Sequence, residues 1–200
     1  MGLEKVKCGK IFFKQEEITG MSVKERCKRG IGYIPSDRYK RAILPGFSLK
    51  DNYLLGNQYK DSYARKGMLN QEYIEKKTKE LMEKFDVRAV NGDQLIGALS
   101  GGNQQKLVLS REVDKDPDLI LACQPVRGLD IGAIKFIHNV LLELRNQGKA
   151  VLLISAELSD LFQLSDRIGV LYKGEMMSLQ ETEKYTTESI SLLMAGKKGV

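Results

Sequence analysis

Cysteine, histidine and long apolar runs are scarce in this sequence. Its three cysteines, Cys8, Cys27 and Cys123, lie far apart without a C-x-x-C spacing, and there is only one histidine. This scarcity argues against a zinc site or a disulfide framework and indicates a reducing compartment. No apolar run reaches the length of about 18 residues that spans a bilayer. Residues 1–5 also lack the apolar segment that begins a secretory signal.

Several nucleotide-binding and catalytic motifs are missing from the 200 residues. The phosphate-loop pattern G-x-x-x-x-G-K-[ST] does not occur, because the Gly-Lys pairs at 9–10, 148–149 and 196–197 lack both the upstream glycine and the following Ser or Thr. Neither G-x-G-x-x-G nor G-x-S-x-G is present. The sequence therefore gives no support to dinucleotide binding or to a serine-hydrolase elbow.

The net charge of +6 is concentrated in the first third of the chain. Residues 1–66 hold 15 Lys and Arg against 7 Asp and Glu, whereas residues 67–200 hold 17 against 19. A basic surface of this kind faces nucleic acid, anionic lipid or an acidic partner in some proteins. More often it is only a solvated surface. The basic residues lack the interleaved aromatic side chains that bind single-stranded nucleic acid.

The most informative stretch is Leu99-Ser100-Gly101-Gly102-Asn103-Gln104-Gln105-Lys106. A serine and two glycines lead directly into an amphipathic run, which predicts a tight loop that ends in the first turn of a helix. Such a turn offers unpaired backbone N–H groups, a positive dipole end and a hydroxyl group, and these bind anions. An ordinary helix capped by Ser100 explains the same residues equally well from the pattern alone.

The first half of the chain predicts few strands and several short helices. We expect a strand or hairpin over 5–18 that breaks at Cys8-Gly9, a helix after Ser22, and a strand over 31–34 followed by a polar loop over 36–41. Ser48 is expected to cap a helical turn, and an apolar stripe predicts a helix over 71–85. Residues 48–113 are therefore predicted to form a mostly helical lobe with few strands.

The second half alternates buried strands with helices. Apolar runs at 119–123 and 150–155 predict buried parallel strands, and helices are expected over 131–147 and through 158–162. This order predicts a parallel α/β architecture. A hairpin with a Lys173-Gly174 turn should follow over 168–179, and residues 180–200 read as a short helix and a basic end.

Two of these segments, taken together, resemble the ABC-type ATPases. Leu99–Lys106 resembles their signature motif, and 119–133, which contains Arg127-Gly128-Leu129-Asp130, resembles their Walker B strand and D-loop. With Gly32-Tyr33-Ile34-Pro35, the chain is similar to the second nucleotide-binding half of tandem importer ATPases for simple sugars and nucleosides. The resemblance implies a partial P-loop NTPase core over 1–200 with an inserted helical subdomain at 48–113. The Walker B side and the hairpin would then occupy 114–180.

The resemblance also implies a binding role for particular residues. Ser100, Gly101 and Gly102 would contact the γ-phosphate of an ATP, with its Mg²⁺, that a second nucleotide-binding domain holds across a head-to-tail dimer. Asn103 replaces the more usual glutamine of the motif, Gln105 matches it, and Asp130 would lie in the D-loop at the dimer seam. The helical lobe would face transmembrane permease subunits at the cytoplasmic side of the plasma membrane, indirectly serving a substrate-binding protein.

Four positions depart from the family pattern, and all four are catalytic in the family. The Walker B aspartate falls at Cys123, the catalytic glutamate at Gln124, the switch histidine at Ala156 and the Q-loop glutamine at Ser36. A thiol and an amide cannot replace two carboxylates beside a metal ion and a water molecule. The chain is therefore expected to offer no catalytic residue and no metal ligand, and not to hydrolyse ATP by itself.

The segment that carries the phosphate loop in the family precedes the part that resembles residues 5–18. The chain is accordingly expected to lack the Walker A strand, loop and helix, and to leave one flank of the 119–123 strand uncovered. The main hypothesis is a degenerate half of a sugar or nucleoside importer ATPase. A soluble ABC-type module acting on nucleic acid, which the resemblance disfavours, and a truncated reading frame without its own function are the alternatives.

Overall fold

The computed structural model describes residues 1–197, and the chain divides into two compact units, Met1–Leu152 and Leu153–Val200. Each unit is described by itself. Within the described residues no helix has both the length and the apolar character needed to cross a bilayer.

A three-stranded sheet forms the centre of the first unit. Strands β3 (Ile31–Ile34), β6 (Leu119–Cys123) and β7 (Ala150–Ile154) lie in the order β3-β6-β7. The last strand, β7, extends by two residues into the second unit. β3 and β6 are parallel, with Ile31 opposite Leu119 and Ile34 opposite Ala122. The predicted parallel pairing is therefore confirmed, and it brings the carboxyl ends of β3 and β6 to the same edge of the sheet.

Two predictions about this sheet are wrong. The strand at 119–123 has no uncovered flank, since β6 is the middle strand and pairs on both sides. The strand at 150–155 was predicted to be buried, yet Leu152 and Ile154 are 53% and 51% exposed. The apolar run does form a strand, but exposure alternates along β7: Leu152 and Ile154 share one face of the strand and are exposed, while the side chains between them are half-buried.

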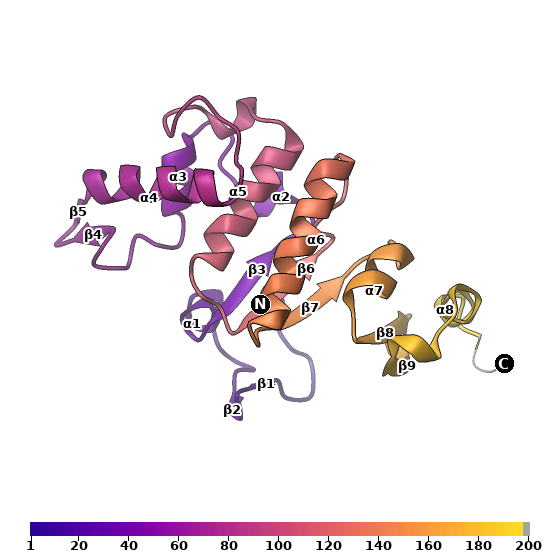
Figure 1. Ribbon diagram of the computed structural model, residues 1–200. Helices are drawn as coiled ribbons and strands as arrows, with labels where there is room; N and C mark the ends of the chain where they lie inside the picture. The colour runs from indigo at the N-terminus through magenta and orange to yellow at the C-terminus, as the bar shows by residue number, and fades with distance from the viewer. Residues whose placement is uncertain (198–200) are drawn as a thin grey trace. The chain divides into compact units, whose positions relative to one another are not determined.

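Helices α1 (Val23–Lys28), α5 (Gly101–Val113) and α6 (Ile131–Asn146) accompany this sheet, and α5 and α6 lie side by side (Figure 1). Ser22 caps α1 as predicted, and Glu25 completes a capping box. α5 is the most deeply buried helix, since Leu107, Val108 and Leu109 are fully buried. The buried part of α5 therefore fixes the position of the helix's first turn.

The predicted helical lobe contains α3 (Leu49–Leu54), α4 (Gln71–Lys84) and the short 3₁₀ helix η1 (Ile96–Ala98). Ser48 caps α3, and the stripe of α4 buries Ile74, Thr78 and Leu81, as expected. The lobe also contains a small hairpin, β4 (Ala64–Arg65) and β5 (Met68–Leu69), that the sequence did not predict. Its turn uses positive φ angles at Lys66 and Gly67, and only the glycine is typical of such a turn.

Two local predictions in residues 1–42 need correction. The first hairpin, β1 (Phe12–Phe13) and β2 (Glu16–Glu17), turns at Lys14-Gln15 rather than breaking at Cys8-Gly9. The segment predicted as a polar loop contains a helical turn, α2 (Arg38–Arg41). Asp37 caps this turn by accepting a hydrogen bond from the Lys40 N–H.

The second unit contains α7 (Leu158–Leu164), β8 (Arg167–Tyr172), β9 (Glu175–Glu181), η2 (Thr182–Lys184) and α8 (Thr187–Met194). The antiparallel pair β8–β9 and its turn at Lys173-Gly174 confirm the predicted hairpin. Ile168, Val170, Tyr185 and Ile190 form its core. The last part of the predicted basic end, 198–200, lies outside the described residues.

Candidate functional site

The site is built on the first turn of α5. Ser100 has extended backbone angles, and its Oγ accepts a hydrogen bond from the Asn103 N–H at 3.4 Å, so Ser100 is the N-cap. The backbone N–H groups of this turn have no carbonyl partner within the helix. They give the turn the partial positive charge that favours an anion.

Glycines at 101 and 102 allow neighbouring elements to approach this turn closely. A Cβ atom on Gly102 would lie 3.0 Å from Ala133 Cβ and 3.1 Å from Asp130 Oδ2, both at the start of α6. A Cβ atom on Gly101 would lie 2.6 Å from Nη2 of Arg38. The two glycines therefore bring α6 on one side and α2 on the other against the signature-like turn.

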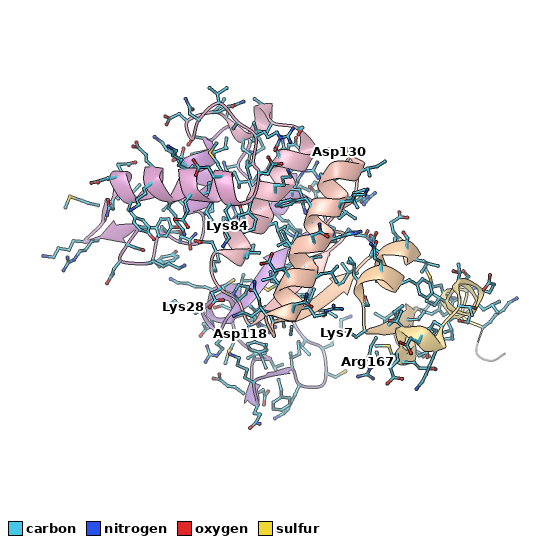
Figure 2. The ribbon with its side chains drawn as sticks, viewed as in Figure 1. Lys7, Lys28, Lys84, Asp118, Asp130 and Arg167 are labelled. Carbon is cyan, nitrogen blue, oxygen red and sulfur yellow. The ribbon has the colours of Figure 1, made fainter. Side chains whose placement is uncertain are left out.

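A cavity of about 380 Å³ opens beside this turn. Its walls come from the first two turns of α5 and α6 and from the segment after α4. The lining residues are Asp86, Arg88, Ser100, Gly102, Asn103, Lys106, Asp130, Gly132, Ala133 and Phe136. Asp130, labelled at the start of α6 in Figure 2, caps that helix through a 2.9 Å hydrogen bond from the Ala133 N–H to its Oδ1.

The charges on the cavity wall are largely paired with one another. Lys106 Nζ lies 2.6 Å from Oδ2 of Asp86 and 4.7 Å from the ring centre of Phe136. Arg88 Nε also contacts Asp86, at 3.4 Å. The hydrogen bond from Lys106, followed by that from Arg88, lowers the pKa of Asp86. Both cations share this carboxylate, but Arg88 uses only its Nε and its side chain is 80% exposed. The donors that remain for an anion are therefore the backbone N–H groups, the Ser100 hydroxyl and the other guanidinium N–H groups of Arg88.

The structure brings together four of the six residues that the sequence proposed for nucleotide binding. Ser100, Gly102, Asn103 and Asp130 line the cavity, whereas Gly101 and Gln105 do not. Gly101 instead lies against Arg38, and Gln105 is buried with 3% of its surface exposed. The roles of all six residues stay predictions.

Sequence reasoning missed Asp86, Arg88 and Phe136 as parts of this cavity. The Arg88 N–H donates a 2.9 Å hydrogen bond to Oδ1 of Asn103, fifteen residues further along the chain. No local pattern marks such a contact. The only feature of the sequence that could have pointed to Asp86 and Arg88 is their place directly after a correctly predicted helix.

The four positions predicted to be degenerate lie at or just after the ends of strands. Ser36 and Gln124 follow β3 and β6, and Cys123 is the last residue of β6. Burial raises the pKa of the Cys123 thiol, so the thiol is neutral near pH 7. Ala156 belongs to the second unit.

Residues 1–197 contain no group of three or more His, Cys, Asp or Glu side chains that could hold a metal ion. Cys123 and Gln124 provide no carboxylate oxygen, which is the ligand that Mg²⁺ prefers. These two residues therefore do not fit a Mg²⁺ site.

Comparison with known proteins supports the resemblance over the full chain. The guanosine import ATP-binding protein NupO of Bacillus subtilis is 42% identical over 195 residues, which cover 98% of this chain. The nucleoside import ATP-binding protein NupA of Lactococcus lactis is 38% identical, and a ribose import ATP-binding protein RbsA of the same species is 32% identical. The chain spans only 38% of the length of NupO and of NupA.

Solved structures show the fold. The ATP-binding cassette MJ0796, in a dimeric post-hydrolysis state with ADP and Pi, superposes with a TM-score of 0.74 and 22% identity over 92% of this chain and 77% of that one. The cassette MJ1267 gives a TM-score of 0.71 with 20% identity, over 98% of this chain and 77% of its own. The fold is therefore the α/β ATP-binding cassette fold with a parallel sheet. The family model described as ABC transporter matches residues 1–127, which are more than half of this chain. The chain therefore belongs to the ABC transporter family.

Proposed function

We propose that this chain is an ATP-binding component of an ABC importer for simple sugars or nucleosides. In this proposal Ser100, Gly101 and Gly102 contact the γ-phosphate of an ATP that a second nucleotide-binding domain holds with its Mg²⁺. The names of the relatives, which are guanosine, nucleoside and ribose import proteins, support the substrate class.

The single observation behind the trans role is an intact anion-binding turn without catalytic carboxylates. Ser100 and the two glycines begin α5 beside a cavity of about 380 Å³, while the Walker B and catalytic positions hold Cys123 and Gln124. When bound, Mg²⁺·ATP supplies the phosphoryl group for transfer to water. The residues of this chain would bind the terminal phosphate but would not orient Mg²⁺ or the attacking water.

Transmembrane permease subunits are the proposed partners of the helical lobe, together with an indirect substrate-binding protein. Phe47 and Leu95 lie on neighbouring segments, since Ser48 and Leu95 form a β-bridge. Their side chains are 53% and 52% exposed, which leaves apolar surface available to a partner. With these partners, the chain would lie peripherally on the cytoplasmic face of the plasma membrane.

The test measures ATP-dependent association by sedimentation. The chain is mixed with an ABC nucleotide-binding domain that has an intact phosphate loop and a substituted catalytic glutamate. We expect the chain alone to show no ATP turnover, and the mixture to form a heterodimer only with Mg²⁺·ATP.

Ser100→Arg should abolish this association, because the side chain fills the turn. Ser22→Arg is the matched control, since it removes the N-cap of α1 and should leave association intact. If both variants associate like the unmodified chain, or if the chain alone turns over ATP, the proposal fails.

A nucleic-acid-binding module is the alternative, because the first third is basic. Some of its cations form ion pairs, however. Lys10 pairs with Glu17, Lys14 with Asp118, and Arg29 with Glu16. Salt-dependent binding of DNA or RNA at physiological ionic strength would favour this alternative. The mass of the native polypeptide would test the remaining hypothesis, a truncated reading frame without its own function.

A further inference from the structure

Three serines cap helices in the first unit, and two of them use their hydroxyl proton within the cap. Ser22 Oγ donates to the carboxylate of Glu25 at 2.6 Å, and Ser48 Oγ donates to that of Asp51 at 2.5 Å. In both cases the acceptor is the third residue of the helix, as in a capping box. These two hydroxyl protons are therefore not available to a ligand.

Ser100 differs because the third residue of its helix is Asn103. Oδ1 of Asn103 accepts a 2.9 Å hydrogen bond from the Arg88 N–H, which can only donate. This contact fixes the orientation of the amide. Nδ2 of Asn103 must then face Ser100 Oγ, at 3.1 Å, and donate to it.

The hydroxyl of Ser100 thus accepts from the side chain and from the backbone N–H of Asn103. Its own proton has no acceptor among residues 1–197, and the serine is exposed on the cavity wall. A hydroxyl that accepts on its inner side presents its proton outward. The cavity therefore faces a hydrogen-bond donor at Ser100.

We propose that Asn103 is a positioning residue that directs the Ser100 hydroxyl proton toward a phosphoryl oxygen. Such an oxygen is an acceptor only, so it needs this orientation. An acidic residue at 103 would complete a capping box like that of Ser48 and Asp51, and would turn the proton inward. The inference rests on the proposed function of the signature turn.

The decisive variant is Asn103→Asp, measured in the same ATP-dependent association assay. We expect its free energy of unfolding to equal or exceed that of the unmodified chain, because a carboxylate suits a helix N-terminus. Association at pH 7.5 should nevertheless weaken about tenfold or more, the effect of one misdirected hydrogen bond. Asn103→Gln retains an amide donor, and we expect its association to stay within about threefold of the unmodified chain.

Two measurements separate this role from others. Hydrogen exchange of the Arg88 N–H should be equally slow in the Asp variant, since either carboxylate oxygen accepts its hydrogen bond. In a Ser100→Ala background, Asn103→Asp should weaken association much less than it does with Ser100 present. An equal penalty in both backgrounds would mean simple charge repulsion and would overturn the inference.

The inference also fails if the Asp variant associates as well as the unmodified chain, or if the Asp and Gln variants are equally weak. If the unmodified chain itself shows no ATP-dependent association, the proposed function fails first, and this inference fails with it. The pattern of results therefore identifies which of the two is wrong.

Discussion

The ammonium group of Lys106 lies 2.6 Å from the Asp86 carboxylate and 3.0 Å from the Asp86 backbone carbonyl. Asp86 follows the end of α4, whereas Lys106 is in the second turn of α5, so this contact joins the end of α4 to the signature-like helix. The Lys106 side chain is 11% exposed and that of Asp86 is 51% exposed. Removing the carboxylate would leave a nearly buried cation whose remaining partners among residues 1–197 are the carbonyl and the Phe136 ring.

We predict that Asp86→Asn destabilises the chain at neutral pH. Asn tolerates the positive φ of 48° at this position, so the backbone is preserved. A hydrogen bond between charged groups contributes more than a neutral one, but exposure of Asp86 screens the pair, and we expect a loss of about 1 kcal/mol. The loss is measured as the difference between the free energies of unfolding of the two proteins, each obtained by urea titration.

The pH dependence of this difference is a further check on the same pair. Because the folded-state pKa of Asp86 is lowered by Lys106, its stabilisation is present above the unfolded-state pKa, about 3.9. It is lost as the pH falls through the folded-state pKa. The two proteins should therefore differ at pH 7 and converge in acid. A difference that persists unchanged below about pH 3 would assign the effect to packing instead of charge.

Gly101 and Gly102 form a matched pair for a second prediction. In Gly102→Ala the new Cβ atom meets Ala133 Cβ and Asp130 Oδ2, which are fixed at the start of α6. We expect a loss of about 1–3 kcal/mol in the free energy of unfolding. In Gly101→Ala the close atom is the end of the flexible Arg38 side chain, so the loss should be below about 0.5 kcal/mol. Equal effects in urea denaturation would contradict this difference.

Arg111 on α5 carries the third prediction. Its Nη1 and Nη2 donate 2.9 Å hydrogen bonds to the carbonyls of Asn52 and Ala42, and its side chain is 7% exposed. Arg111→Met leaves both carbonyls without this donor, so we expect a loss of about 3 kcal/mol. Arg41→Met, at an exposed position, is the control and should change stability by less than about 0.5 kcal/mol. Thermal or urea unfolding of both variants decides the comparison.

Features with a local cause were predictable from the sequence. Ser22, Ser48 and Ser100 are all N-caps, because a hydroxyl before an amphipathic run satisfies first-turn N–H groups wherever the chain then goes. The strands at 31–34 and 119–123 likewise follow from short apolar runs between turn residues. The sequence alone therefore predicts where the signature-like helix begins.

Features that depend on contacts between distant segments were not predictable. The central place of β6 follows from pairing with two remote strands. Similarly, the cavity wall at Asp86 and Arg88 exists because the end of α4 meets Asn103 and Lys106. Composition and periodicity describe one segment at a time, so they do not predict which distant segments are in contact.

Gln104 provides a last prediction about such a distant contact. The side chain is fully buried, and its amide joins the signature-like loop to α2. Oε1 accepts from Arg38 Nε at 3.2 Å, while Nε2 lies 3.0 Å from both the Leu99 carbonyl and the Tyr39 hydroxyl. The same nitrogen lies 3.2 Å from the Ile96 carbonyl.

In Gln104→Leu, buried carbonyls lose their donor and α2 loses its attachment to the loop. We expect the free energy of unfolding to fall by about 3 kcal/mol. Gln105→Leu is the matched control, because the neighbouring side chain is also buried but makes no hydrogen bond within residues 1–197. Its effect should stay near or below about 1 kcal/mol. If the two leucine variants unfold at the same urea concentration, the amide of Gln104 does not stabilise the junction between α2 and α5.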